Sequence, residues 1–183
     1  QMTGGMRSAM VDEARLFFDS IVRENRSVVS FVDSDYTFLN EPLARIYGLE
    51  KSVSGTQMRK VQLKNANRGG ILAMPGTLAM TSYAERTSPV KRGAWLLETI
   101  FNRPPTEPKV AFAIENDTKE AAQQMSIRQK FEAHRNKAAC YSCHIRLDPP
   151  GFALERFDAV GRWRDTDGGQ PVDARGEWGG APF

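Results

Sequence analysis

Both cysteines of this chain fall within one pentapeptide, Cys140-Tyr141-Ser142-Cys143-His144. Because the 183 residues contain no other cysteine, a set of disulfides cannot hold the fold together, and a packed apolar core must do so. A chain of this length can build such a core, since it buries about two-thirds of its unfolded surface. With 40% hydrophobic and 26% charged residues, the composition is that of a globular protein and excludes wholesale disorder.

Charge and hydropathy exclude two broad classes of function. The 25 Lys and Arg residues oppose 22 Asp and Glu residues and are spread along the chain. A net charge of +3 is too small to predict a nucleic-acid partner. No stretch approaches the roughly 18 consecutive apolar residues that a membrane span needs. We therefore expect neither a nucleic-acid partner nor a membrane span.

Hydrophobic periodicity predicts a mainly α fold with irregular loops between the helices. Capping residues mark several helix starts: Ser27, Asn40 and the pair Ser88-Pro89, while Gly48 marks a stop. The expected helices cover about residues 5–25, 28–33, 41–47, 90–101 and 118–139. Residues 61–63 and 70–72 are expected to be short extended segments. Residues 104–108 are rich in proline and are expected to form an extended surface linker.

The pentapeptide predicts a cofactor, because Cys-x-x-Cys-His is the attachment signature of c-type haem. Two thiols add across the two vinyl groups of one porphyrin edge, and the histidine that follows is held beneath the iron as its ligand. The two residues between the thiols let a tight helical turn match the separation of the vinyl groups. We therefore predict one haem c, attached through Cys140 and Cys143, with His144 as the proximal ligand.

Three other uses of these residues stay open as lesser alternatives. A structural zinc site needs four ligands, and this chain offers at most Cys140, Cys143, His144 and His134. A redox-active cysteine pair of the thioredoxin type follows a strand, whereas a helix is expected before this motif. A plain structural disulfide is the third alternative.

Covalent haem carries an expectation about the cellular compartment. The c-type linkage is made outside the bacterial cytoplasm, so we expect a periplasmic or extracellular protein. No signal peptide opens the sequence, because no charged segment is followed there by an apolar one. We expect that signal to lie upstream, in a longer precursor.

If a methionine or histidine of this chain is the second axial ligand of the iron, that residue must precede the haem motif in the sequence. No methionine or histidine follows His144, whereas the distal methionine of small soluble cytochromes c lies after the haem motif. Met74 precedes a Pro-Gly pair that breaks the local periodicity, so we predict that a loop there presents Met74 to the iron. Met80, His134, another chain, or no ligand at all are the alternatives. For both methionines the simpler interpretation is core packing.

Longer motifs around these residues resemble those of large multidomain secreted proteins, the planctomycetal-type cytochrome c proteins. The motifs are Tyr36-Thr37-Phe38-Leu39-Asn40, Arg86-Thr87-Ser88-Pro89-Val90-Lys91-Arg92-Gly93, the pentapeptide, and Asp148-Pro149-Pro150-Gly151-Phe152-Ala153-Leu154-Glu155-Arg156-Phe157-Asp158. The resemblance covers nearly the whole chain. It implies the helical tail of an upstream domain over residues 1–50, a cytochrome c-like helical haem domain with irregular loops over 51–169, and the start of a further domain or a tail over 170–183. A more distant resemblance is to diheme peroxidase-like cytochromes, from which the single haem motif departs.

The resemblance also implies roles for individual residues around the haem. Pro150, within Pro149-Pro150-Gly151, would turn the chain tightly beneath the haem, and Phe152 would pack against the porphyrin. Arg92 and Arg162 would meet the propionates, since guanidinium groups suit paired carboxylates. Trp163 could donate its N–H to a propionate. The simpler interpretation of each arginine is a solvated surface charge.

The function predicted from these features is single-electron transfer by an extracytoplasmic c-type cytochrome domain, without catalytic residues. Its partners would be a redox protein and the neighbouring domains of a longer chain. One alternative is a haem enzyme with an open distal site, of the peroxidase kind, which the missing downstream ligand keeps open. The other is a haem-stabilised module that organises a larger assembly.

Overall fold

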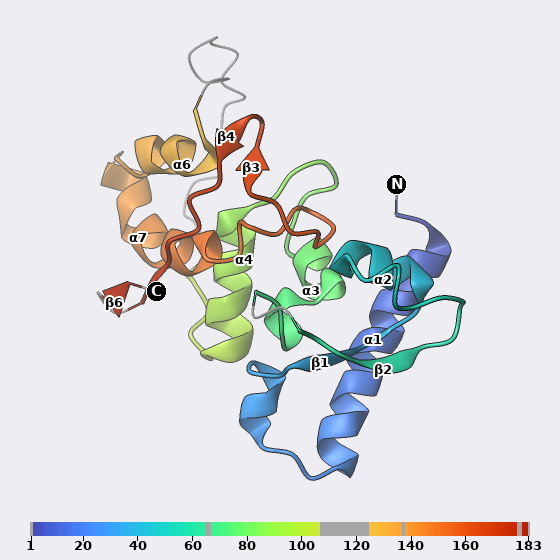
Figure 1. The fold of residues 1–183 in the computed structure, drawn as a ribbon. Coiled ribbons are helices and arrows are strands. Elements are labelled where there is room, and N and C mark those ends of the chain that lie inside the picture. The colour runs from blue at the N-terminus through green and yellow to red at the C-terminus, as the bar shows by residue number, and fades with distance from the viewer. Residues whose placement is uncertain (1, 65–66, 107–124, 137, 179–180, 183) are drawn as a thin grey trace. The chain divides into compact units, whose positions relative to one another are not determined.

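The computed structural model describes residues 2–64, 67–106, 125–136, 138–178 and 181–182. These residues form a mainly α fold, which confirms the predicted fold class (Figure 1). The chain divides into two compact units. The first is Gln1–Glu85 with Phe157–Trp163, and the second is Arg86–Arg156 with Arg164–Phe183. None of the helices within the described ranges combines the length and apolarity that crossing a membrane requires.

The first unit begins with the long amphipathic helix that the periodicity predicts. Helix α1 spans Gly4–Arg23 and is capped by Thr3, whose side chain accepts a hydrogen bond from the Met6 backbone. Helix α2 spans Glu41–Tyr47, and both of its predicted ends are confirmed. Asn40 accepts a hydrogen bond from the Leu43 backbone, and Gly48 ends the helix in the left-handed region at φ 69°.

A two-stranded sheet and three short helices complete the first unit. Strand β1 (Tyr36–Leu39) pairs antiparallel with strand β2 (Arg59–Gln62), with Tyr36 opposite Gln62 and Leu39 opposite Arg59. The extended segment predicted at 61–63 therefore overlaps a real strand, whereas the one predicted at 70–72 is wrong. The short helices are the 3-10 helix η1 (Val28–Phe31), the 3-10 helix η2 (Ile71–Ala73) and helix α3 (Pro75–Met80).

The segment Phe157–Trp163 belongs to the first unit although it is distant in sequence. The guanidinium of Arg68 donates a hydrogen bond to the carbonyl of Gly161 and lies 4.7 Å above the ring of Phe157. Gly161 has φ 87°, and a side chain there would press on Pro75. This segment therefore closes against residues that precede it by about eighty positions or more.

Among its described residues the second unit contains helices α4, α6 and α7, which are labelled in Figure 1, and the π-helix η3. Helix α4 spans Pro89–Trp95, is capped by Ser88 as predicted, and continues into a π-helix, η3, over Leu96–Ile100. Helix α6 spans Ile127–Arg135 and helix α7 spans Ala138–Phe152. Two short hairpins follow, β3 (Thr166–Asp167) with β4 (Gln170–Pro171), and β5 (Glu177–Trp178) with β6 (Ala181–Pro182).

The long helix predicted over residues 118–139 is wrong in its described part. Residues 118–124 lie outside the described residues, and two separate helices follow them. Ser126 starts α6 with a reciprocal capping box, in which its side chain accepts from the Gln129 backbone and Gln129 accepts from the Ser126 backbone. A capping box satisfies backbone donors that only a helix start leaves open, so it separates α6 from whatever precedes it.

Helices α4 and α7 cross each other at very short range, and they lie side by side in Figure 1. A β-carbon placed on Gly93 of α4 would collide with the backbone carbonyl of Leu147. One placed on Gly151 of α7 would collide with the carbonyl of Pro89. Two glycines thus let the two backbones touch, and this contact fixes the helix that carries the Cys-x-x-Cys-His motif.

Candidate functional site

All three chemically distinctive residues of the pentapeptide lie on helix α7. Cys140, Cys143 and His144 stand at positions i, i+3 and i+4, so their side chains leave the same side of the helix. Cys140 is only 5% exposed and Cys143 is half-buried, and both are free thiols. The helical turn that the predicted attachment chemistry requires is therefore present.

His144 is held from two directions. Its Nδ1 lies 2.9 Å from Oδ1 of Asp148, one turn further along α7. Its ring meets the ring of His134 from α6 edge to face, with centroids 4.9 Å apart. The Asp148 side chain is fully buried, whereas the His144 side chain keeps 16% of its surface exposed. Because Nδ1 is engaged by the carboxylate, Nε2 is the nitrogen that remains for a ligand.

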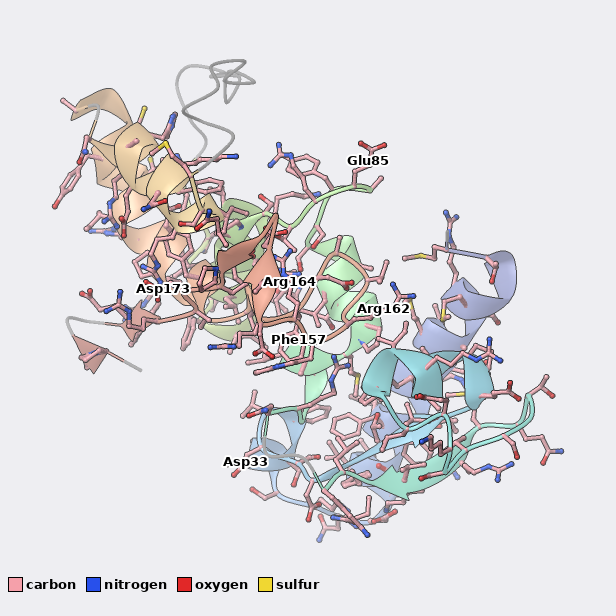
Figure 2. All side chains as sticks on the ribbon, turned by 45° about the horizontal axis from the view of Figure 1, so that its top comes forward. Asp33, Glu85, Phe157, Arg162, Arg164 and Asp173 are labelled. Carbon is pink, nitrogen blue, oxygen red and sulfur yellow. The ribbon has the colours of Figure 1, made fainter. Side chains whose placement is uncertain are left out.

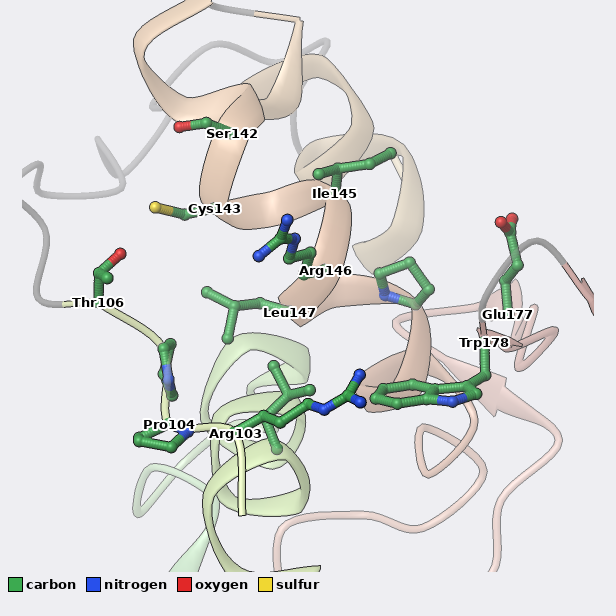
Figure 3. Close-up of a pocket in the computed structure, with 13 residues that line it drawn as sticks. Arg103, Pro104, Thr106, Ser142, Cys143, Ile145, Arg146, Leu147, Glu177 and Trp178 are labelled. Atoms are coloured by element: carbon green, nitrogen blue, oxygen red, sulfur yellow. The ribbon is translucent and has the colours of Figure 1, made fainter. Parts of the chain in front are cut away.

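A pocket of about 680 Å³ opens beside the motif (Figure 3). Its volume lies within the range of cofactor sites, about 300–1,000 Å³. Cys143 lines the pocket, whereas Cys140 and His144 do not. The other lining residues are Leu97, Arg103, Pro104, Pro105, Thr106, Ser142, Ile145, Arg146, Leu147, Pro149, Glu177 and Trp178. Trp178 is steadied by stacking on Phe101, with ring centroids 4.2 Å apart.

The lining of the pocket combines apolar and charged side chains. Two guanidinium groups, those of Arg103 and Arg146, line it together with one carboxylate, that of Glu177. Figure 3 shows these side chains beside Leu147 and Trp178. A cavity that combines apolar side chains with two guanidinium groups suits a flat apolar molecule that carries carboxylates, although Glu177 would oppose an anion near it. Neither Arg103 nor Arg146 was among the arginines that the sequence predicts to bind propionates.

The geometry lends no support to the three alternatives for the cysteines. Within the described ranges, no group of three or more His, Cys, Asp or Glu side chains is arranged to hold a metal ion, as a zinc site requires. The two cysteines are free, so they form no disulfide. Helix α6, and not a strand, precedes the motif, which is not the context of a thioredoxin-type pair.

Arg92 is engaged in a buried ion pair instead of facing a pocket. Its side chain is fully buried, and Nη1 lies 2.9 Å from Oε1 of Glu155 and 2.7 Å from the carbonyl of Leu154. Thr87 donates to the other carboxylate oxygen at 2.5 Å, and Arg164, labelled in Figure 2, approaches it at 3.1 Å. Burial raises the pKa of Glu155, while the positive charge of Arg92 opposes that rise. The propionate role of Arg92 stays a prediction, but its guanidinium is committed to Glu155.

Phe152 and Pro150 both lie in the last turns of α7. Phe152 is 1% exposed, meets Phe131 edge to face at 6.2 Å, and carries the Arg128 guanidinium 4.1 Å above its ring. The predicted tight turn at Pro149-Pro150-Gly151 is wrong, because α7 continues through both prolines. The φ of proline is itself helical, and the contact of Gly151 with α4 holds this end of the helix. Packing of Pro150 and Phe152 against a porphyrin stays a prediction.

The remaining predicted residues, Met74, Arg162 and Trp163, belong to the first unit. The predicted exposed loop at Met74 is wrong. Pro75 begins helix α3, a position that proline favours, and Met74 is 3% exposed in a cluster with Phe17, Ile21 and Tyr36. That environment is the one expected for core packing, and the ligand role stays a prediction. Met80, by contrast, is 62% exposed.

Arg162, labelled in Figure 2, and Trp163 end the Phe157–Trp163 segment. The side chain of Arg162 is 62% exposed, and its Nη1 lies 4.0 Å from the Asp158 carboxylate. Trp163 meets Phe157 edge to face at 5.3 Å and is 39% exposed. Their contacts with propionates stay predictions.

A buried acid on α1 was missed from the sequence. Glu13 carries an ionisable side chain, yet it is fully buried. Thr37 and Tyr47 donate hydrogen bonds to its Oε1, at 2.7 and 2.5 Å. Burial raises its pKa to about 7, and these two hydrogen bonds and the charge of Arg68 limit the rise. The signal was its spacing, because Glu13 lies three residues after Met10 and four before Phe17 on the apolar side.

Comparison with protein families gives two matches. Residues 68–167, more than half of the chain, match the family model described as "PSCyt3: Protein of unknown function (DUF1588)". Residues 1–49 match the one described as "PSD4: Protein of unknown function (DUF1592)". Both are families of planctomycete-type, cytochrome c-like multidomain proteins, and neither match is to a peroxidase family. No curated protein and no solved structure matched the chain.

Proposed function

We propose that this chain, which belongs to the PSCyt3 family of proteins of unknown function (DUF1588), is a c-type cytochrome domain. In this proposal it holds one haem covalently and passes single electrons between partner proteins, as part of a multidomain chain outside the cytoplasm. The haem iron supplies the one-electron couple when bound. The chain supplies the two attachment thiols, the proximal ligand and the walls of the site.

One observation carries the proposal. Cys140, Cys143 and His144 stand on one side of α7, and the Nδ1 atom of His144 is occupied by Asp148. A histidine that ligates a metal through one ring nitrogen nearly always engages a carboxylate or carbonyl through the other. The buried Asp148 carboxylate has one oxygen, Oδ2, for which the described residues provide no hydrogen-bond partner. A positive centre behind His144 would compensate such a buried charge.

The cysteines, the histidine and the arginines of the chain have different roles in this proposal. Cys140 and Cys143 would each add a thiol across one vinyl group, with a sulfur–carbon bond formed and the thiol hydrogen passing to the other vinyl carbon, so no oxidant would be consumed. His144 would offer Nε2 to the iron. Arg103 and Arg146 line the pocket that Cys143 reaches, so we assign the propionates to these two guanidinium groups.

The experiment is a mass measurement on the full chain, produced in a bacterial periplasm where haem can be attached. The wild-type mass is expected to exceed the sequence mass by one haem. The Cys140→Ala/Cys143→Ala variant is expected to lose that increment. Ser142→Ala is the matched control, because Ser142 lies between the cysteines and supplies no thiol. A wild-type chain without the increment would overturn the proposal.

A visible spectrum then separates electron transfer from the haem-enzyme alternative. Electron transfer predicts low-spin iron with two axial ligands, and a methionine ligand predicts the weak long-wavelength absorption band that a Met–iron bond gives. High-spin iron that reacts with peroxide would favour the enzyme instead. Because Cys140 is only 5% exposed, we also expect the side chains that cover this thiol to move when haem is attached.

A further inference from the structure

The Asp148 carboxylate lies in an environment that is unusual for a charged group. The residue has no exposed surface, and its Oδ1 lies 2.9 Å from Nδ1 of His144. Its other oxygen, Oδ2, finds no hydrogen-bond partner among the described residues. Burying a carboxylate is costly unless a positive charge pairs with it, and the partner of this carboxylate is an imidazole, which carries no permanent charge.

The contact also indicates which nitrogen of His144 carries hydrogen. An ionised carboxylate oxygen only accepts, so with Asp148 ionised Nδ1 donates, and the neutral ring then has its lone pair on Nε2. Residues 144 and 148 are one helical turn apart, which brings the carboxylate under the ring without a loop. From α6, His134 packs its ring edge to face against the same imidazole. The His144 ring is therefore restrained before any ligand binds.

We propose that Asp148 is the positioning residue of the haem site. It holds His144 in the tautomer that ligates through Nε2, and it makes that nitrogen a stronger electron donor. A stronger donor stabilises the oxidised iron, so Asp148 lowers the reduction potential. This inference rests on the proposed function, because it needs an iron at Nε2. Its geometric part concerns only the chain and can be tested without haem.

The first test uses the full chain with haem attached. Asp148→Asn keeps the shape but removes the charge, and Asp148→Ala removes both. We expect the one-haem mass increment to persist in both variants. We expect the reduction potential to rise, so that the ratio of oxidised to reduced protein at a fixed potential falls by about tenfold or more, which is about 59 mV for a one-electron couple. Asp148→Glu is expected to recover part of the shift, because it restores a carboxylate.

The matched control is Asp165→Asn. Asp165 lies in the same unit and pairs with Arg156 at 2.5 Å, on an exposed surface. It is expected to leave the potential unchanged. Haem-bearing Asp148→Asn and Asp148→Ala proteins with the wild-type potential would overturn the inference. A wild-type chain without haem would instead defeat the proposed function, so the two failures are distinguishable.

The second test needs neither haem nor a folded variant. Nitrogen-15 NMR of the haem-free wild-type chain reports the tautomer of His144. The inference predicts hydrogen on Nδ1 and a lone pair on Nε2. The opposite tautomer would overturn the assignment even where the Asp148 variants do not fold.

Discussion

The backbone carbonyl of Leu147 stands where a β-carbon on Gly93 would be, so helix α7 touches the backbone of helix α4 at this point. A second contact of the same kind joins Gly151 to the carbonyl of Pro89. Leu147 follows His144 by less than one turn. The position of His144 therefore depends on a glycine in another helix, about fifty residues earlier.

Alanine at either glycine is expected to destabilise the chain. Gly93→Ala and Gly151→Ala must push the two helices apart, which costs about 1–3 kcal/mol or more. Chemical denaturation checks this, and a visible spectrum of the haem-bearing protein should show a disturbed iron site. Gly5→Ala is the matched control. Gly5 lies in α1 with nothing within 4 Å of its β-position, so alanine there should stabilise slightly. Equal stability of the Gly93 variant and the wild type would contradict the contact.

Removing Arg92 is expected to be among the most damaging single changes. Arg92→Met leaves the buried Glu155 carboxylate without its closest cation, and breaking a buried pair in this way costs about 3–5 kcal/mol. The double variant Arg92→Met/Glu155→Met should recover part of the loss, because no buried charge is then unpaired. Urea denaturation measures both. Arg45→Met serves as the control, since its pair with Glu41 is exposed, and little change is expected there. If the double variant loses as much free energy of unfolding as Arg92→Met does, packing and not charge is responsible for the loss.

Glu13 is expected to make stability depend on pH. Burial raises its pKa to about 7 in the folded chain, compared with the ordinary value of 4.5 that applies to the unfolded chain, so folding favours the protonated acid. The stability from this preference is fully present below pH 4.5, declines as pH rises, and is lost above about pH 7. The whole loss amounts to about 3 kcal/mol. Glu13→Gln should flatten the curve between pH 4.5 and 7.

The measurement is the free energy of unfolding across that range, compared between variants. Glu50→Gln is the control, because Glu50 is exposed and should leave the wild-type slope unchanged. A Glu13→Gln curve parallel to the wild type would show that Glu13 is ionised at the same pH in both states.

Met74 offers a test that separates packing from ligation. Met74→Leu keeps the volume of a buried side chain and should cost less than about 1.5 kcal/mol, whereas Met74→Ala should cost about 2–5 kcal/mol. If Met74 is the distal ligand, the leucine variant also loses the Met–iron band while remaining folded. A leucine variant with an unchanged low-spin spectrum refutes the ligand prediction and leaves core packing as the role of Met74.

Local signals were sufficient for much of the fold. Asn40 with Gly48, and Ser88 with Pro89, mark helix ends through hydrogen bonds and backbone angles that depend on a few neighbouring residues. The Cys-x-x-Cys-His spacing likewise placed its residues on one helical turn. Burial was harder to predict, because it depends on residues distant in sequence. Glu13 is buried with partners 24 and 34 positions away, and its charge alone gives no sign of that burial.

At the candidate site, too, contacts between neighbouring residues can be predicted from the sequence, whereas contacts between distant residues cannot. Asp148 lies one turn from His144, a spacing that a sequence shows directly, although only the structure reveals its burial. Arg92 was predicted to meet propionates because a guanidinium suits carboxylates. It does meet a carboxylate, but that of Glu155, 63 positions later. Composition alone cannot distinguish an internal acid from one on a cofactor.

The return of Phe157–Trp163 to the first unit limits where this chain can be cut. A truncated protein that stops at Glu85 would keep Arg68 but lose the carbonyl of Gly161 and the ring of Phe157, two of its contacts in that segment. The side of helix α3 that Gly161 covers, at Pro75, would be bared to water. Neither unit is one continuous stretch of sequence, so a single cleavage separates no intact module. An expression vector meant to produce either unit must therefore encode both units.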